Sequence, residues 1–372
     1  MCGIIGYVGH QQATPILLDG LARMEYRGYD SAGVAVRSET KGLQVYKSKG
    51  RLQVLSDMIH GGADVEGTLG IGHTRWATHG EPNDINAHPH VSEDGRIAMV
   101  HNGIIENYME IKQQLLRHGV TFKSETDTEV AAQLLEFHYN ECHNMLEAVG
   151  RVLRRIEGSY AFGIICADYP NALIAARKDS PMVIGIADGE SYLASDVPAI
   201  LKYTRNVYYI GNLELARLQK GKVTFFNLDG DEIQKDLVEI TWNAEAAEKA
   251  GFEHFMMKEI HEQPKAVRDT LNSILHDGVI DLQTMGLTEE EMRDTQQIYM
   301  IGCGSAYHVG VAAQYTVEDL AQIPVRVELA SEFRYRRLLV GETKESVLAP
   351  IQALLDDLMA KDPAIKAKVS FA

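Results

Sequence analysis

The chain has 372 residues, of which 45% are apolar and 24% charged, so it is long enough for two ordinary domains and is not a disordered chain, a collagen or a coiled coil. Lys and Arg number 36 against 52 Asp and Glu, and the resulting net charge of −16 repels nucleic acids and anionic membranes. The sequence has no apolar run of about 18 residues and no secretory leader, so we expect a cytoplasmic protein that binds neither nucleic acid nor membrane.

The first hundred residues predict mostly β-structure. The opening run CGIIGYVG is typical of a buried strand. Apolar residues at helical spacing follow from Ile16 to Met24, and Gly28 is the expected stop of that helix. Four more strands are expected between turn residues, at 33–36, 43–46, 70–73 and 97–100.

A second group of strands follows a predicted helix. Thr126 and Glu129 have the spacing of a capping box, which places Asp127 in the first turn of a helix whose apolar face includes Val130 and Leu134. Strands are then expected at 160–166, 173–176, 182–186, 191–194 and 207–210. We expect these later strands to form a second sheet.

A polar, alanine-rich segment at 241–251, TWNAEAAEKAG, is the expected linker between two domains. Beyond it the pattern predicts a helix at 265–275, a buried strand at 298–301, a glycine loop and a helix at 309–320. This order is typical of a βα unit in a doubly wound sheet.

The four cysteines are too scattered for a disulfide framework, and none forms a C-x-x-C pair. Cys2 differs from Cys142, Cys166 and Cys303 in its position. If Met1 is removed, Cys2 carries both a thiol and an α-amine, whose reference pKa is about 7.7 to 8. Cys2 would then supply both the nucleophile and the base of a reaction.

Three further stretches carry polar residues that suit amide chemistry. Arg75 offers the bidentate hydrogen-bond donors that a substrate carboxylate needs, and the plain alternative is an ordinary salt bridge in a surface loop. Asn102 and Gly103 at a strand end could meet an oxyanion, and a tight turn is the plain alternative. Asp127 could pair with an ammonium group or simply charge the start of a helix.

Five histidines lie between His73 and His101, at spacings of 6, 9, 2 and 11 residues. These spacings match no compact ligand pattern, and no cysteine lies nearby. We therefore expect no metal site.

Several motifs occur in one order over some 130 residues, namely CGIIGYVG, MEYRGYDSAG, HTRWATHG, NAHPH, HNGIIEN and SETDTE. In this order they resemble the N-terminal-nucleophile glutamine amidotransferases and, among these, the glucosamine-6-phosphate synthases. The resemblance implies a four-layer αββα glutaminase domain, Cys2 as nucleophile with its own α-amine as base, and no cofactor. It also implies that Asn102 and Gly103 form the oxyanion hole and that Arg27 orders the site around Cys2. The glutamine pocket that it implies consists of Arg75, Trp76, Thr78, His79 and Asp127.

After the linker, IYMIGCGSAYHVG resembles the sugar isomerase half of the same family. In that context Gly304, Ser305 and Ala306 are expected to bind a sugar phosphate with backbone N–H groups and a hydroxyl. The resemblance ends near Arg336. The expected division is a glutaminase domain at 1–240, a linker at 241–251, a truncated, doubly wound isomerase domain at 252–336 and a tail at 337–372 that lies outside the family.

Two origins of the tail remain open. Its GET sequence at Gly341 could be the remnant of a family loop after an internal deletion. The tail also resembles the small domain of zinc-dependent peptidases of the acetylornithine deacetylase kind, which indicates a fusion, and we favour the fusion. Either origin puts the family's dimer contacts in doubt.

The family reaction converts L-glutamine and D-fructose 6-phosphate into L-glutamate and D-glucosamine 6-phosphate. With an incomplete isomerase half, we expect this chain to retain only glutamine hydrolysis. Two alternatives remain, a non-catalytic protein that binds sugar phosphate or regulates a partner, and an amidotransferase for another acceptor.

Overall fold

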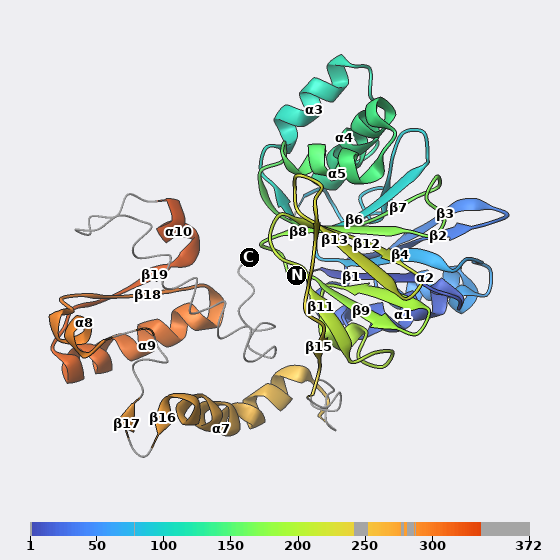
Figure 1. The fold of residues 1–372 in the computed structure, drawn as a ribbon. Helices are drawn as coiled ribbons and strands as arrows, with labels where there is room; N and C mark the ends of the chain where they lie inside the picture. The colour runs from blue at the N-terminus through green and yellow to red at the C-terminus, as the bar shows by residue number, and fades with distance from the viewer. Residues whose placement is uncertain are drawn as a thin grey trace. The chain divides into compact units, whose positions relative to one another are not determined.

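The chain divides into two units, Met1–Glu248 and Lys249–Ala372 (Figure 1). The computed structural model describes residues 2–77, 79–241, 252–276, 279–280, 286 and 288–335. The division between the units falls within the segment predicted as a linker. Residues 242–251 of that segment and the tail predicted at 337–372 lie outside the described residues.

Two antiparallel sheets form the centre of the first unit. The first has eight strands in the order β15-β11-β9-β10-β1-β4-β2-β3, and the second has seven in the order β14-β13-β12-β8-β7-β6-β5. The bounds in the first sheet are β1 Gly3–Val8, β2 Ser31–Ser38, β3 Gly42–Lys49, β4 Leu69–Arg75, β9 Val183–Ala187, β10 Glu190–Ala194, β11 Asn206–Tyr209 and β15 Val238–Glu239. Those in the second are β5 His90–Val91, β6 Ile97–Ile105, β7 Gly158–Cys166, β8 Leu173–Lys178, β12 Glu214–Gln219, β13 Lys222–Phe226 and β14 Glu232–Ile233.

Helices cover the outer faces of both sheets, as Figure 1 shows. Their bounds are α1 Ala13–Ala22, α2 Leu52–Met58, α3 Tyr108–Arg117, α4 Asp127–Cys142 and α5 Met145–Leu153, with short 3-10 turns η1 Glu25–Arg27, η2 His60–Gly62 and η3 Val197–Ala199. Because successive side chains point to opposite faces of a strand, one strand contributes residues both to the core under the helices and to the core between the sheets. In β1, Ile5 packs with the helices α1 and α2, while Ile4 packs between the sheets.

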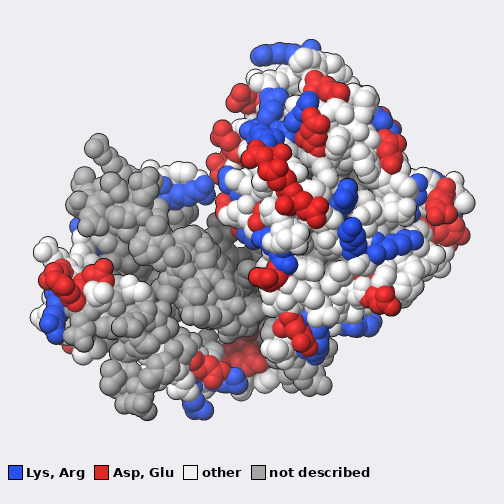
Figure 2. Space-filling model, in the orientation of Figure 1, with Lys and Arg blue, Asp and Glu red and all other residues white. Residues whose placement is uncertain are grey.

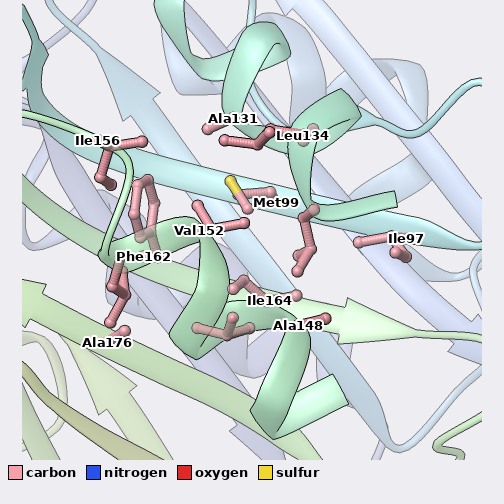
Figure 3. Packing of buried hydrophobic residues seen from close by; sticks show 14 of the residues in the cluster. Ile97, Met99, Ala131, Leu134, Ala148, Val152, Ile156, Phe162, Ile164 and Ala176 are labelled. Atoms are coloured by element: carbon pink, nitrogen blue, oxygen red, sulfur yellow. The ribbon is translucent and has the colours of Figure 1, made fainter. Parts of the chain in front are cut away.

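The second sheet shows the same alternation. Met99 and Phe162 face α4 and α5 in a core that Figure 3 shows from close by, while Val100 and Ala161 face the first sheet. The layers are thus helices, sheet, sheet and helices, which is the predicted αββα arrangement. The predicted grouping of strands was wrong, however. The first sheet takes β9, β10 and β11 from the later group, since β10 pairs with β1 and not with its nearer neighbour β8.

The helix expected to stop at Gly28 ends at Ala22 instead, and Gly28 follows the 3-10 turn η1. A Cβ at Gly28 would lie 2.7 Å from the carbonyl carbon of Arg75, so glycine is needed there for close backbone packing. The predicted capping box is half right. Thr126 accepts from the Glu129 N–H, but the Glu129 carboxylate accepts from Lys123 and Ser124, because the chain before the helix brings these N–H groups nearer.

The described part of the second unit contains the predicted βα arrangement. Its elements are α7 Phe255–Ile274, β16 Leu275–His276, β17 Val279–Ile280, α8 Glu289–Asp294, β18 Ile298–Gly302, α9 Gly304–Ala321, β19 Val325–Leu329 and α10 Ala330–Tyr335. Strands β18 and β19 are parallel, and α9 connects them. Gly302 and Gly310 allow α9 to pack closely on this pair, since a Cβ on either would lie 3.0 Å from a neighbouring atom.

No helix among the described residues is long and apolar enough to cross a membrane. On the face of the first unit shown in Figure 2, acidic and basic side chains are interspersed.

Candidate active site

Cys2 lies immediately before β1, which pairs with β10 on one side and β4 on the other. Its half-buried Sγ accepts a hydrogen bond from the Trp76 N–H at 3.2 Å. Burial raises the pKa of the Cys2 thiol, while the Trp76 N–H and the positive charge of Arg75 act to lower it. Because burial has the larger effect, the thiol needs a base to become a thiolate.

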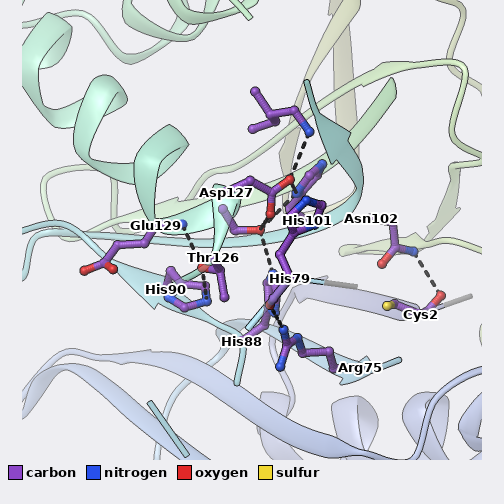
Figure 4. A network of polar contacts seen from close by, with 12 residues as sticks. Cys2, Arg75, His79, His88, His90, His101, Asn102, Thr126, Asp127 and Glu129 are labelled. Atoms are coloured by element: carbon purple, nitrogen blue, oxygen red, sulfur yellow. Dashed lines mark hydrogen bonds and ion pairs between the residues drawn. The ribbon is translucent and has the colours of Figure 1, made fainter. Parts of the chain in front are cut away.

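Asn102 reaches Cys2 from the other sheet, where it lies near the end of β6 (Figure 4). Its Nδ2 donates to the Cys2 carbonyl oxygen at 3.0 Å, and its Oδ1 lies 3.0 Å from Nε2 of His73. The next residue, Gly103, has φ +130, and a Cβ there would lie 2.1 Å from the Ser159 carbonyl oxygen. Only glycine fits this position, directly after the residue whose amide contacts Cys2.

Arg75 is buried at the end of β4, and its side chain binds the loop that follows. The guanidinium donates to the carbonyl oxygens of His79, Gly80 (3.1 Å) and Glu81 (3.5 Å). Burial lowers the pKa of Arg75, while the nearby carboxylates of Asp30 and Asp127 act to raise it. In this state the predicted carboxylate-binding fork is occupied by backbone carbonyls.

Asp30 is a part of the site that the sequence analysis did not single out. Its Oδ2 accepts from the Ala77 N–H at 2.8 Å, and its own N–H donates to the Arg75 carbonyl at 3.0 Å. Asp30 therefore fixes the backbone on either side of Trp76, whose N–H contacts Cys2. The signal was its place in the MEYRGYDSAG motif, three residues after Arg27.

Asp127 begins α4 and is buried. Its Oδ2 accepts from the Ile105 N–H at 2.9 Å and lies 3.9 Å from Nδ1 of His101. The carboxylate thus holds the end of β6, just beyond Asn102 and Gly103.

Trp76 and His79 are placed less directly. Trp76 is 46% exposed and its ring makes an edge contact with Tyr29, while its backbone N–H contacts Cys2. His79 packs edge-on against Tyr108. Thr78, the remaining predicted pocket residue, lies outside the described residues.

Arg27 is buried in η1 and pairs with the carboxylate of Asp196. Ser195, which precedes Asp196, extends the pairing of β10 with β1. Its N–H donates to the Ile4 carbonyl oxygen at 3.0 Å, and its Oγ accepts from the Ile4 N–H at 3.0 Å. Arg27 therefore ties the segment before β2 to the strand beside Cys2.

Four of the five motif histidines are buried in one cluster. The rings of His73 and His88 stack at 4.2 Å, and His88 meets His90 edge-on at 4.8 Å. Threonines at the start of α4 complete the cluster, with Thr128 at 2.8 Å from His88 and 2.9 Å from His101, and Thr126 at 3.0 Å from His90. Among the described residues, no three His, Cys, Asp or Glu side chains are arranged to hold a metal ion.

The predicted sugar-phosphate loop lies in the second unit, at the N-terminus of α9. Gly304, Ser305 and Ala306 are all exposed, and Gly304 has φ +55. Cys303 precedes the helix and makes no side-chain capping bond.

Residues 40–227 match the glutamine amidotransferase domain family, and residues 291–348 match the SIS domain family, twelve residues beyond the expected end of the resemblance at Arg336. The glutamine–fructose-6-phosphate aminotransferase [isomerizing] of Caldanaerobacter subterraneus subsp. tengcongensis is 54% identical over 92% of this chain and 56% of its own length. That of Clostridium perfringens is 47% identical over 99% of this chain and 61% of its own length. The chain thus spans little more than half the length of these relatives, and they confirm the predicted resemblance.

The fold also has a match among solved structures. The glutamine phosphoribosylpyrophosphate amidotransferase of B. subtilis, solved with ADP and GMP, aligns with a TM-score of 0.55 at 20% identity, over 94% of this chain and 70% of that one. At this identity the likeness shows the fold alone.

Proposed function

The chain belongs to the glutamine amidotransferase family, and from this premise we propose that its first unit releases ammonia from L-glutamine with Cys2 as the nucleophile. The observation that carries the proposal is the meeting of two N–H donors at Cys2. The Trp76 N–H donates to Sγ, and the Asn102 amide donates to the carbonyl oxygen of Cys2.

The first step needs a base for the Cys2 thiol, whose pKa is raised by burial. We propose that removal of Met1 exposes the α-amine, which takes the thiol proton directly or through one water molecule. The thiolate then attacks the side-chain amide carbon of glutamine and forms a tetrahedral oxyanion. The N–H groups of Asn102 and Gly103 are the proposed donors to this oxyanion.

Collapse of the intermediate breaks the C–N bond, and ammonia leaves with the proton that the α-ammonium returns. The product is a γ-glutamyl thioester on Cys2. Water then attacks the thioester, glutamate leaves, and the thiol is restored, so one glutamine and one water give one glutamate and one ammonia.

The charged end of glutamine has two proposed partners, Arg75 for the carboxylate and Asp127 for the ammonium. Both side chains are buried, and burial strengthens charge pairs. Because Arg75 donates to the carbonyls of His79, Gly80 and Glu81, a substrate carboxylate would replace some of these bonds. We propose that Trp76, Thr78 and His79 complete the pocket and that Arg27 orders it through Asp196.

The names of the relatives imply D-fructose 6-phosphate as the acceptor of the ammonia in a complete enzyme, with D-glucosamine 6-phosphate as the product, and we propose that this chain keeps the sugar phosphate as a ligand but only hydrolyses glutamine. Gly304, Ser305 and Ala306 would bind the phosphate of the sugar at the start of α9. A sugar phosphate substrate and four free cysteines favour a cytoplasmic location.

The test measures glutamate and glucosamine 6-phosphate from the full chain with glutamine, in the presence and absence of fructose 6-phosphate. We expect glutamate from the wild type and a loss of at least about 10⁴-fold in Cys2→Ala, because the variant has no nucleophile. Cys142→Ala is the matched control, since Cys142 lies at the far end of α4 and should leave the rate unchanged.

Each outcome separates the alternatives. Glutamate that forms equally in Cys2→Ala, or not at all in the wild type, would refute the glutaminase. Glutamate without glucosamine 6-phosphate would limit this chain to hydrolysis, as we expect, and sugar amination would extend it to the full reaction.

A further inference from the structure

His73 connects the two sheets through Asn102, the residue whose amide contacts Cys2. It lies on β4 of the first sheet, is fully buried, and reaches Asn102 on β6 of the second sheet. Its Nε2 lies 3.0 Å from Oδ1 of Asn102 and 3.0 Å from the carbonyl oxygen of His101. None of the roles assigned above uses this side chain.

The partners of His73 determine which ring nitrogen carries the proton. A backbone carbonyl oxygen only accepts, so Nε2 must be the donor. Nδ1 is buried without a hydrogen-bond partner. Burial also lowers the pKa of His73 to about 3, so the ring is neutral with its single proton on Nε2.

The ring itself cannot turn freely. It stacks on His88 at 4.2 Å with an interplanar angle of 27°, and His88 is in turn held by Thr128 at 2.8 Å. The donor is therefore fixed in both identity and direction before any substrate binds.

The two ends of the Asn102 amide have opposite chemistry, and a half-turn of the group would exchange them. In the flipped state Oδ1 would face the Cys2 carbonyl oxygen, and Nδ2 would face the Nε2–H of His73. Both contacts would be repulsive, and no N–H of Asn102 would remain for an oxyanion. The contact with His73 excludes this state.

We propose that His73 is a positioning residue for amide hydrolysis, which holds the Asn102 amide with its N–H groups toward Cys2. This inference rests on the proposed glutaminase function. It requires that loss of the Nε2–H donor slows the chemical step and leaves glutamine binding nearly unchanged, since Arg75 and Asp127 bind the charged end of the substrate.

The test compares His73→Leu with His73→Gln in the full chain. Leucine fills a similar space without a donor, while the amide nitrogen of glutamine can occupy the position of Nε2. We expect kcat for glutamate release to fall about 100-fold in His73→Leu with KM within about 3-fold of the wild type, a loss like that of one oxyanion donor. His73→Gln should restore kcat to within about 5-fold of the wild type.

His138→Leu is the matched control, because His138 is a buried histidine in α4 whose Nδ1 faces Glu141. It should leave kcat unchanged. A second test repeats His73→Leu in an Asn102→Ala background, where no amide remains to be positioned and kcat should fall no further. If His73→Leu does not fold, His73→Asn replaces it, since its shorter side chain cannot reach Oδ1 of Asn102.

The proposal is overturned if His73→Leu keeps the wild-type kcat, if it raises KM alone, if His73→Gln fails to restore the rate, or if the losses of His73 and Asn102 multiply. Absence of glutamate from the wild type would instead refute the proposed function, so the two failures are distinguishable.

Discussion

Two helices in this molecule begin at candidate sites, and their N-termini differ in how their N–H groups are satisfied. At α4, Thr126 accepts from the Glu129 N–H at 3.2 Å, and the buried threonines on either side of Asp127 hold histidines. At α9, Cys303 provides no cap, and residues 304–306 are exposed. The first terminus holds the protein's own side chains, and the second carries exposed residues at the place where we propose that the sugar phosphate binds.

Lowering the pH should produce the largest difference in stability between the first unit and the second unit. Burial lowers the pKa of His73 to about 3, lowers those of His88 and His90 well below the usual value, and lowers that of His101. In the unfolded chain these rings titrate near pH 6.5. Below that pH the unfolded state binds more protons, so the free energy of unfolding falls by up to about 1.4 kcal/mol per pH unit for each histidine.

We therefore expect the free energy of unfolding of the first unit to fall by several kcal/mol between pH 7 and pH 5. Urea unfolding monitored by hydrogen exchange and mass spectrometry measures this change. The second unit should change less, because the residues described there include no cluster of buried histidines. His88→Asn should make the pH dependence shallower. A first unit equally stable at both pH values would contradict the buried, neutral state of the cluster.

Two threonine caps give a smaller and more local comparison. Thr126→Ala removes a buried cap and leaves Nε2 of His90 without its partner, so we expect the first unit to lose about 2 to 3 kcal/mol. Thr288→Ala removes an exposed capping box at α8 and should lower stability by about 1 kcal/mol, in the second unit only. Unit-resolved hydrogen exchange measures both, and equal losses would show that burial at α4 adds nothing.

The smallest expected effect concerns α9. Ser305→Ala removes one hydroxyl from the proposed phosphate loop, so fructose 6-phosphate should bind about 5-fold more weakly, a difference of about 1 kcal/mol. Glutamate release should not change. Isothermal titration calorimetry measures the affinity, and Ser305→Thr, which keeps the hydroxyl, serves as the control. Unaltered affinity in Ser305→Ala would remove this hydroxyl from the phosphate site.

Local features of the fold could be predicted from the sequence, because their causes lie within a few residues. The cap at Thr126 and the strands at β6 and β7 are examples. The α5 helix was missed although Asn144 gives a cap signal, and so was the β12–β13 hairpin at Gly221. Sheet membership could not be predicted, since β1 pairs with a strand more than 180 residues away.

The candidate site shows the same limit. Motif order singled out Cys2 and Asn102, but the contact between them spans 100 residues and depends on the packing of two sheets. The histidine spacings argued against metal, yet nothing in them placed four rings in one buried cluster or assigned His73 to Asn102. Such contacts follow from tertiary structure and leave no periodic trace in the sequence.

The position of Cys2 next to β1 also bears on how the molecule fluctuates. Every residue of β1 is buried, and the strand is hydrogen-bonded on both sides, so its amide protons should be among the last to exchange with solvent. The sulfur of Cys2 is thus one residue away from a strand that we expect to open among the last in the first unit. Partial opening at the edges of the sheets can occur without displacing it, and only global unfolding should release it.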